Sequence, residues 1–231
     1  MEESASKGTL YIVSTPIGNL DDITFRAIKI LSSVDVIAAE DTRKTKILLD
    51  HYKISKPMVS YFDHNERFRS SQLIERLLRG ESVAVVSDAG TPGISDPAYR
   101  IVRDSIDKGI PVVPIPGASA LLAALVAGGL PMNNFVFEGF LPLKKGRKTR
   151  LEFLRSEKRT IVLYESPHRI IKTLRELQQY LGDREIVIAR EVSKKFEEFL
   201  RGRTSDILDK ISSSMPRGEF VILIDGNPIP S

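Results

Sequence analysis

The densest run of polar and glycine residues lies at positions 87–97, directly after the apolar run Val83–Val86. An unbroken apolar run of this kind predicts a strand that is buried on both faces of a parallel sheet. In open α/β sheets, the loop at the carboxyl end of such a strand borders the ligand crevice. This loop has neither the GxGxxG spacing nor the lysine of a phosphate-binding loop, and its first charged residue is Asp88. These features favour a cationic or hydroxyl-rich ligand, although an ordinary strand-to-helix turn would use the same glycines.

Four more clusters of polar or small residues follow predicted strands in the first half of the chain. They read TPIGN, EDTR, DHNE and PGASA, at residues 15–19, 40–43, 63–66 and 116–120. Because the carboxyl ends of parallel strands meet at one edge of a sheet, these clusters and the loop 87–97 should converge. Taken alone, EDTR is better explained as a helix N-terminus, DHNE could be an N-cap and PGASA a hinge. Five such clusters along one edge of a sheet, which we call the rim, indicate a ligand-binding site.

The elements that position these clusters alternate between short apolar runs and helical periodicity, which predicts βαβ units. Strands are expected at 9–14, 34–39, 58–62, 83–86 and 110–115, and later at 135–140, 160–164, 185–189 and 220–224. Helices are expected at 44–51, 66–79 and 170–182, with Asp21 or Asp22 capping an earlier helix and Pro97 in the first turn of another. We therefore predict an α/β fold of two lobes with a cofactor cleft between them. Residues 1–115 form an N-terminal α/β lobe with a mostly parallel sheet, and residues 116–231 form a C-terminal α/β lobe.

A basic run in the second half has five cations within seven positions and no acidic residue among them. A charge run of this kind is usually a solvated loop. At the mouth of a cleft it would instead neutralise phosphates and give a salt-dependent affinity for RNA. The candidate RNA contacts are Lys144, Lys145, Arg147, Lys148 and Arg150.

The composition, with 42% hydrophobic and 28% charged residues, is that of a soluble globular protein. No apolar run reaches the roughly 20 residues needed to span a bilayer, and residues 1–7 lack the apolar core of a signal peptide. The absence of cysteine suits the cytosol and excludes a thiolate metal site, and three scattered histidines argue against a histidine-based zinc site, so no metal is expected. The net charge of +4 is weak evidence for a nucleic-acid partner.

The order of the motifs resembles the ribosomal RNA small subunit methyltransferase I family, a branch of the tetrapyrrole methylase superfamily. The resemblance runs from about Gly8 to Ile224. The matching motifs are GTLYIVSTPIGNLDDIT, AAEDTR, SYFDHNE, SDAGTPGISDPA, PIPGASA, LYESPHRI, AREVSKKFEEFLRG and GEFVILI.

The resemblance implies transfer of a methyl group from S-adenosylmethionine to a ribose 2′-hydroxyl of a cytidine in the decoding region of 16S rRNA. It further implies a cytoplasmic homodimer that acts on 16S rRNA or on the 30S subunit. Asp88 joins the predicted cofactor contacts because a carboxylate suits a positive sulfonium. The full set is Pro16, Asp88, Ala89, Gly90, Thr91, Ile94, Ser119, Ala120, Tyr164 and Glu165.

A ribose hydroxyl is a poor nucleophile, so a general base should assist it by about 10²–10⁴-fold. The candidate bases are Glu40, Asp41, His64 and Glu66, with Arg43 or Lys194 stabilising the alkoxide or a neighbouring phosphate. The sequence does not choose among them. Two other functions fit the same fold: methylation of a small tetrapyrrole-like acceptor, and a non-catalytic RNA-binding role in assembly.

Overall fold

The computed structural model describes residues 7–213 and 215–226. The chain divides into two compact units, one ending at Ser119 and the other beginning at Ala120. Each unit holds one five-stranded sheet with helices against it, so the expected α/β fold class is confirmed. No helix in the described ranges combines the length and the apolar character needed to cross a membrane.

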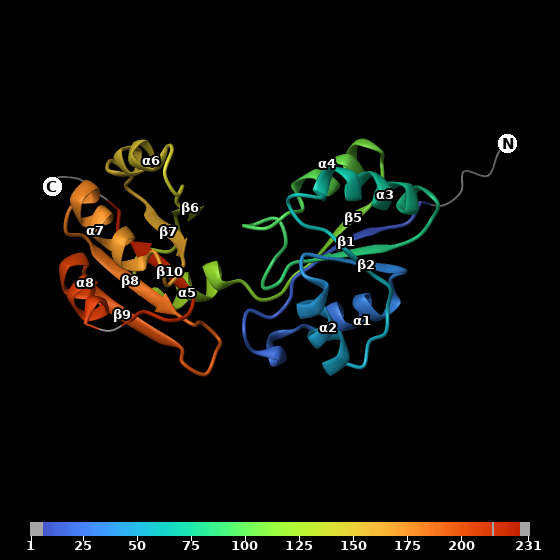
Figure 1. The fold of residues 1–231 in the computed structure, drawn as a ribbon, viewed down its shortest axis with the longest axis horizontal. Helices are drawn as coiled ribbons and strands as arrows, with labels where there is room; N and C mark the ends of the chain where they lie inside the picture. The colour runs from blue at the N-terminus through green and yellow to red at the C-terminus, as the bar shows by residue number, and fades with distance from the viewer. Residues whose placement is uncertain (1–6, 214, 227–231) are drawn as a thin grey trace. The chain divides into compact units, whose positions relative to one another are not determined.

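The sheet of the first unit, coloured blue to green in Figure 1, is parallel throughout. Its strand order is β3-β2-β4-β1-β5. All five carboxyl ends therefore lie along one edge. The bounds are Leu10–Val13 (β1), Val36–Ala39 (β2), Met58–Ser60 (β3), Val83–Val86 (β4) and Val112–Ile115 (β5).

Helices cover both faces of this sheet. Helices α1 (Phe25–Ser33) and α2 (Thr42–His51) pack on one face, and α3 (Glu66–Leu78) and α4 (Tyr99–Asp107) pack on the other. Along the central strand β4, alternate side chains enter the two cores, with Val83 and Val85 in one and Ala84 and Val86 in the other. Burial on both faces explains why this strand is apolar at every position.

The sheet of the second unit has the order β6-β7-β10-β8-β9, and only the β6–β7 pair is parallel. Its strands are Phe135–Phe140 (β6), Thr160–Glu165 (β7), Glu185–Arg190 (β8), Glu198–Arg203 (β9) and Phe220–Ile224 (β10). Helices α6 (Arg147–Leu154), α7 (Ile170–Leu181) and α8 (Thr204–Ser212) pack on one face, and α5 (Ala120–Gly128) packs on the other. A Cβ at Gly128 would lie 2.3 Å from Leu223 Cδ1, so small residues let α5 approach the sheet closely.

Several local predictions were wrong. The side chain of Thr24, and not of Asp21 or Asp22, caps α1, while a 3₁₀ turn at Leu20–Asp22 precedes that helix. Pro97 lies before α4, which begins at Tyr99. Strand β9 and helix α8 were not predicted at all.

Candidate active site

The loops after β1 and β4 are joined by a pair of backbone hydrogen bonds. The Thr15 N–H donates to the Gly90 carbonyl at 2.8 Å, and the Gly90 N–H donates to the Thr15 carbonyl at 3.1 Å. Gly90 has a φ of 80°, a left-handed conformation that glycine adopts without steric cost. The Thr15 hydroxyl also donates to the Ser87 carbonyl at 3.2 Å. These bonds fix the turn that follows the central strand.

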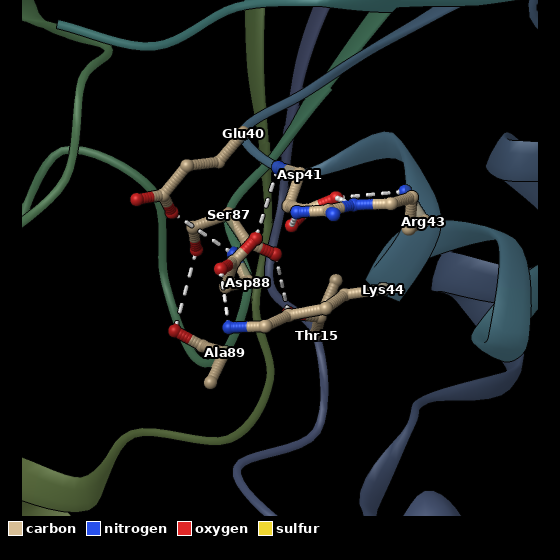
Figure 2. A network of polar contacts seen from close by, with 8 residues as sticks. All are labelled: Thr15, Glu40, Asp41, Arg43, Lys44, Ser87, Asp88 and Ala89. Carbon is tan, nitrogen blue, oxygen red and sulfur yellow. Dashed lines mark hydrogen bonds and ion pairs between the residues drawn. The ribbon is translucent and has the colours of Figure 1, made fainter.

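The loops after β2 and β4 are joined by carboxylates that accept from backbone N–H groups (Figure 2). The Asp88 N–H donates to Glu40 Oε2 at 3.1 Å, and the Asp41 N–H donates to Asp88 Oδ1 at 3.0 Å. Lys44 on α2 reaches the same group, with its Nζ 2.7 Å from Asp88 Oδ2. Both carboxylate oxygens of Asp88 therefore accept hydrogen bonds from neighbouring residues of the rim, and Lys44 balances its charge.

Asp41 and Arg43 form a two-pronged ion pair at the start of α2. Arg43 Nε lies 3.0 Å from Asp41 Oδ1, and Nη2 lies 2.7 Å from Oδ2. The hydrogen bonds from the Arg43 side chain hold the pKa of Asp41 well below its usual range, so Asp41 is a weak base. The side chain of Arg43 remains 89% exposed, and Asp41 fixes its direction.

Glu40 and Asp96 are the carboxyl groups of this rim whose pKa values are raised. For Glu40 the main cause is burial, with repulsion from Asp88 and Asp63 added to it. For Asp96, burial followed by repulsion from Glu40 raises the pKa to about 6, against a hydrogen bond with the Ser87 side chain that lowers it. Carboxyl groups with raised pKa values at a strand-end rim are candidates for proton transfer.

In the DHNE cluster after β3, Glu66 binds neighbouring elements, whereas His64 is exposed to solvent. Glu66 Oε1 accepts from the Tyr61 hydroxyl at 3.1 Å and from the Arg100 N–H at 3.3 Å, so Glu66 ties the starts of α3 and α4 together. His64 is exposed, with its ring edge-on to Phe62 at 6.2 Å. Among the described residues, His64, a candidate base, forms no hydrogen bond or ion pair with Asp63 or Glu66.

The loop after β5 approaches the end of β1. A Cβ at Gly117 would lie 2.8 Å from Ser14 Cβ, so only glycine fits there without a shift. The Ser14 hydroxyl lies 2.8 Å from Thr91 Oγ1, which also lies 3.4 Å from the Ala118 carbonyl. The segments that follow β1, β4 and β5 thus meet around Thr91. Of the other predicted cofactor contacts in this unit, Pro16 is buried, Ala89 and Ile94 are exposed, and Ser119 is intermediate.

In the second unit, the predicted contacts Tyr164 and Glu165 close strand β7. The Leu121 N–H, in the first turn of α5 that Ala120 begins, donates to the Tyr164 hydroxyl at 3.1 Å. Glu165 is buried and accepts from the Ser166 N–H at 2.8 Å and from the Thr173 hydroxyl at 2.6 Å. The Glu165 carboxylate therefore serves the interior of the unit.

The basic run 144–150 is not a uniform surface. Arg147 is 5% exposed, with bonds to Glu176, Thr173 and the Pro142 carbonyl, so it is not available to RNA. Arg150 is bound to Glu138. The remaining cations, Lys144, Lys145 and Lys148, are exposed.

Lys194, a predicted catalytic residue, bridges two carboxylates of the second unit. Its Nζ lies 2.9 Å from Glu191 Oε1 and 2.8 Å from Glu219 Oε2. In the described part of the chain, no group of three or more His, Cys, Asp or Glu side chains is arranged to hold a metal ion.

Sequence reasoning did not single out Lys44, Ser87 or Asp96 as site residues. Asp96 and Ser87 stand in the SDAGTPGISDP motif, so their position was visible but their burial was not. Lys44 follows the EDTR cluster directly, and its partner Asp88 lies 44 residues further along the chain.

Comparison with known proteins agrees with this architecture. The sequence model of the tetrapyrrole (corrin/porphyrin) methylases matches residues 9–208. The chain therefore belongs to the tetrapyrrole methylase family. Among curated relatives, it is 48% identical to the ribosomal RNA small subunit methyltransferase I of Halalkalibacterium halodurans, covering 98% of this chain and 78% of that protein. The protein of the same name from Thermotoga maritima is 47% identical, with 95% and 99% covered.

Solved structures share the fold at lower identity. A diphthine synthase superposes with a TM-score of 0.75 at 17% identity, covering 96% of this chain and 92% of that one. A uroporphyrin-III C-methyltransferase from Thermus thermophilus, complexed with S-adenosyl homocysteine, superposes with a TM-score of 0.66 at 21% identity, covering 94% and 97%. Identities this low support a common fold only.

Proposed function

We propose that this protein transfers a methyl group from S-adenosylmethionine to the ribose 2′-hydroxyl of a cytidine in the decoding region of 16S rRNA. The observation that carries the proposal is the identity of 46–50% with curated relatives named for small-subunit rRNA methylation, over 95–98% of this chain. The substrate is 16S rRNA or the 30S subunit, and the working form is a cytoplasmic homodimer.

The rim of the first unit suits a positively charged ligand better than a phosphate. The carboxylates Glu40, Asp88 and Asp96 lie there with Lys44, whose charge is already matched by Asp88. Repulsion among these acids would be relieved by a neighbouring cation. When bound, S-adenosylmethionine supplies a methyl group on a positively charged sulfur. The residues of this unit that would hold it are Pro16, Ala89, Gly90, Thr91 and Ile94, while Ser119, Ala120 and Tyr164 stay predicted contacts.

Glu40 is the general base that the contacts favour. Its Oε2 accepts the Asp88 N–H, which fixes the side chain, while Oε1 has no partner among the described residues. Burial raises its pKa, which makes it a stronger proton acceptor than Asp41. A hydroxyl placed at Oε1 would lose its proton to this oxygen as its own oxygen becomes methylated. Asp96 and Ser87 support the turn next to Glu40.

Arg43 is the group we assign to the acceptor side of the reaction. Asp41 holds its guanidinium in a fixed direction, and the side chain is otherwise exposed. A fixed guanidinium can donate to the oxygens of a phosphate or a ribose. We assign Lys144, Lys145 and Lys148 to sequence-independent contact with the RNA backbone.

The proposal is tested by incubating purified protein with labelled S-adenosylmethionine and 30S particles that lack the modification. A ribose methyl at one decoding-region cytidine, mapped by resistance to alkaline hydrolysis, is the expected result. Transfer to a tetrapyrrole but not to the particles would assign the chain to small-molecule methylation. Binding of the particles without transfer would support a non-catalytic assembly role.

A further inference from the structure

The turn that joins β8 to β9, residues 191–197, has an unusual backbone (the orange loop in Figure 1). Glu191 has a φ of 49° and Ser193 a φ of 69°, so two residues with side chains occupy the left-handed region within three positions. This region is sparsely populated by residues other than glycine, and it persists where surrounding contacts hold it. The backbone of this turn is therefore held in one conformation.

The contacts that hold this shape come from the segment before β10. The Glu191 N–H donates to the Glu219 carbonyl at 3.0 Å, and the Glu219 N–H donates to Glu191 Oε1 at 3.0 Å. Lys194 Nζ bridges the carboxylates of these two residues. A Cβ at Gly218 would lie 2.4 Å from Glu191 Cγ, so glycine at this position lets the two segments touch.

The charged groups of this region differ in whether an opposite charge neutralises them. Glu191 and Glu219 bind Lys194, and Glu198 pairs with Arg190 at 3.1 Å. Glu197 is exposed and accepts the Ser193 N–H at 2.6 Å. Two cations, Lys195 and Arg217, pair with no acidic side chain among the described residues and are exposed. Lys195 and Arg217 are therefore free to meet an external anion.

Phe196 belongs to this turn and is 64% exposed. Lys195 Nζ lies 5.7 Å from the centre of the Phe196 ring, within the range of a cation–π contact. An exposed aromatic ring beside an exposed cation, on a rigid support, is the combination that binds single-stranded nucleic acid. The ring stacks on a base, and the cations meet phosphates.

We propose that this turn is an RNA contact, in which Phe196 stacks on an unpaired base and Lys195 and Arg217 meet the flanking phosphates. The inference rests on the proposed function, because it takes RNA as the acceptor. A protein partner fits less well, because protein-binding patches are apolar at their centre and depleted in lysine, whereas Phe196 follows directly on Lys194 and Lys195.

The test uses the full chain and a short single-stranded RNA that contains 2-aminopurine, whose fluorescence falls when it stacks on an aromatic ring. The wild type and Phe196→Trp should both quench the probe. Phe196→Leu keeps an apolar side chain but removes the ring, so quenching should be lost and the Kd should rise about 5- to 150-fold. Lys195→Gln should weaken binding uniformly across sequences and lower the salt slope by about one.

Phe25→Leu is the matched control, because Phe25 is also an exposed phenylalanine (86%) but belongs to α1. It should bind the probe like the wild type, and all variants should share one thermal midpoint, since Phe196 contributes little buried area. Binding by Phe196→Leu that equals the wild type would overturn the stacking role alone. A wild type that binds S-adenosylmethionine but no RNA would instead overturn the RNA acceptor.

Discussion

A charged network at the carboxyl ends of strands in the first unit can be compared with one at the end of β7 in the second. In the first unit, Glu40 and Asp88 hold the loops after β2 and β4 (Figure 2). In the second, Glu165 at the end of β7 is linked through Thr173 to Arg147, which binds Glu176. Both are made of carboxylates, hydroxyls and cationic side chains, so composition does not distinguish them.

The two networks differ in how completely their carboxylates are satisfied. Glu165 has a donor on each oxygen and an ion pair with Arg169 at 3.2 Å. Glu40 has one hydrogen-bond donor within the described part of the chain and a pKa raised by burial. A buried network with every partner present stabilises a fold, whereas an incompletely satisfied one keeps a group available for chemistry. The comparison therefore assigns stability to the network in the second unit and reactivity to the one in the first.

The largest expected effect is on turnover, from Glu40→Gln. The amide keeps an oxygen that can accept the Asp88 N–H but cannot take a proton, so methyl transfer should fall by about 10²–10⁴-fold. Transfer of labelled methyl groups to 30S particles measures it, with cofactor affinity determined separately. Glu165→Gln is the matched control and should retain turnover per folded molecule. Full activity in Glu40→Gln would remove Glu40 from the chemistry.

In the second network, Arg147→Ala should lower the stability of the fold. This change leaves Glu176 Oε2 and the Thr173 hydroxyl without their guanidinium donor. The free energy of unfolding should therefore fall by about 3–5 kcal/mol. Urea-induced unfolding measures the loss. Lys148→Ala, next in the chain, removes only an exposed pair with Glu152 at 3.7 Å and should cost at most about 1 kcal/mol. Equal losses in both variants would contradict the buried role of Arg147.

A smaller effect tests how tightly the strand ends of the first unit meet. Gly117→Ala would place its Cβ 2.8 Å from Ser14 Cβ, so it should lower the free energy of unfolding by about 1–3 kcal/mol. The same substitution in a Ser14→Gly background should cost less, because the opposing Cβ is gone. A double-mutant cycle by urea unfolding measures this coupling. Strict additivity would show that the close approach is not strained.

The sequence predicts the backbone of the site better than its contacts. Strand β4 has the predicted bounds, because a run apolar at every position can only be buried on both faces. Strand β9 was missed because Glu198–Arg203 has just two adjacent apolar residues, Phe199 and Leu200, and no alternation. Edge strands with one exposed face give this weak signal.

Contacts between distant segments could not be predicted, since they depend on strand order. The bonds among Glu40, Lys44 and Asp88 exist because β2 and β4 are neighbours, although β3 separates them in the sequence. The burial of Arg147 was hidden for a similar reason. A run of cations predicts a solvated surface, and its buried partner Thr173 lies 26 residues away.

The smallest expected effect is that of Asp96→Asn, and it depends on pH. The pKa of Asp96 is about 6 in the folded chain, above its ordinary value of 3.8, so the folded state holds the proton more tightly than the unfolded state. Ionisation therefore opposes folding, and stability falls as the pH rises from about 4 to about 6.

Because the asparagine cannot ionise, the variant should be more stable by about 1 kcal/mol at pH 8, an amount reduced by solvent screening, and no more stable at pH 3.5. Thermal unfolding at the two pH values measures the difference between the variant and the wild type. A gain in stability that is the same at both pH values would show that the ionised carboxylate of Asp96 does not oppose folding.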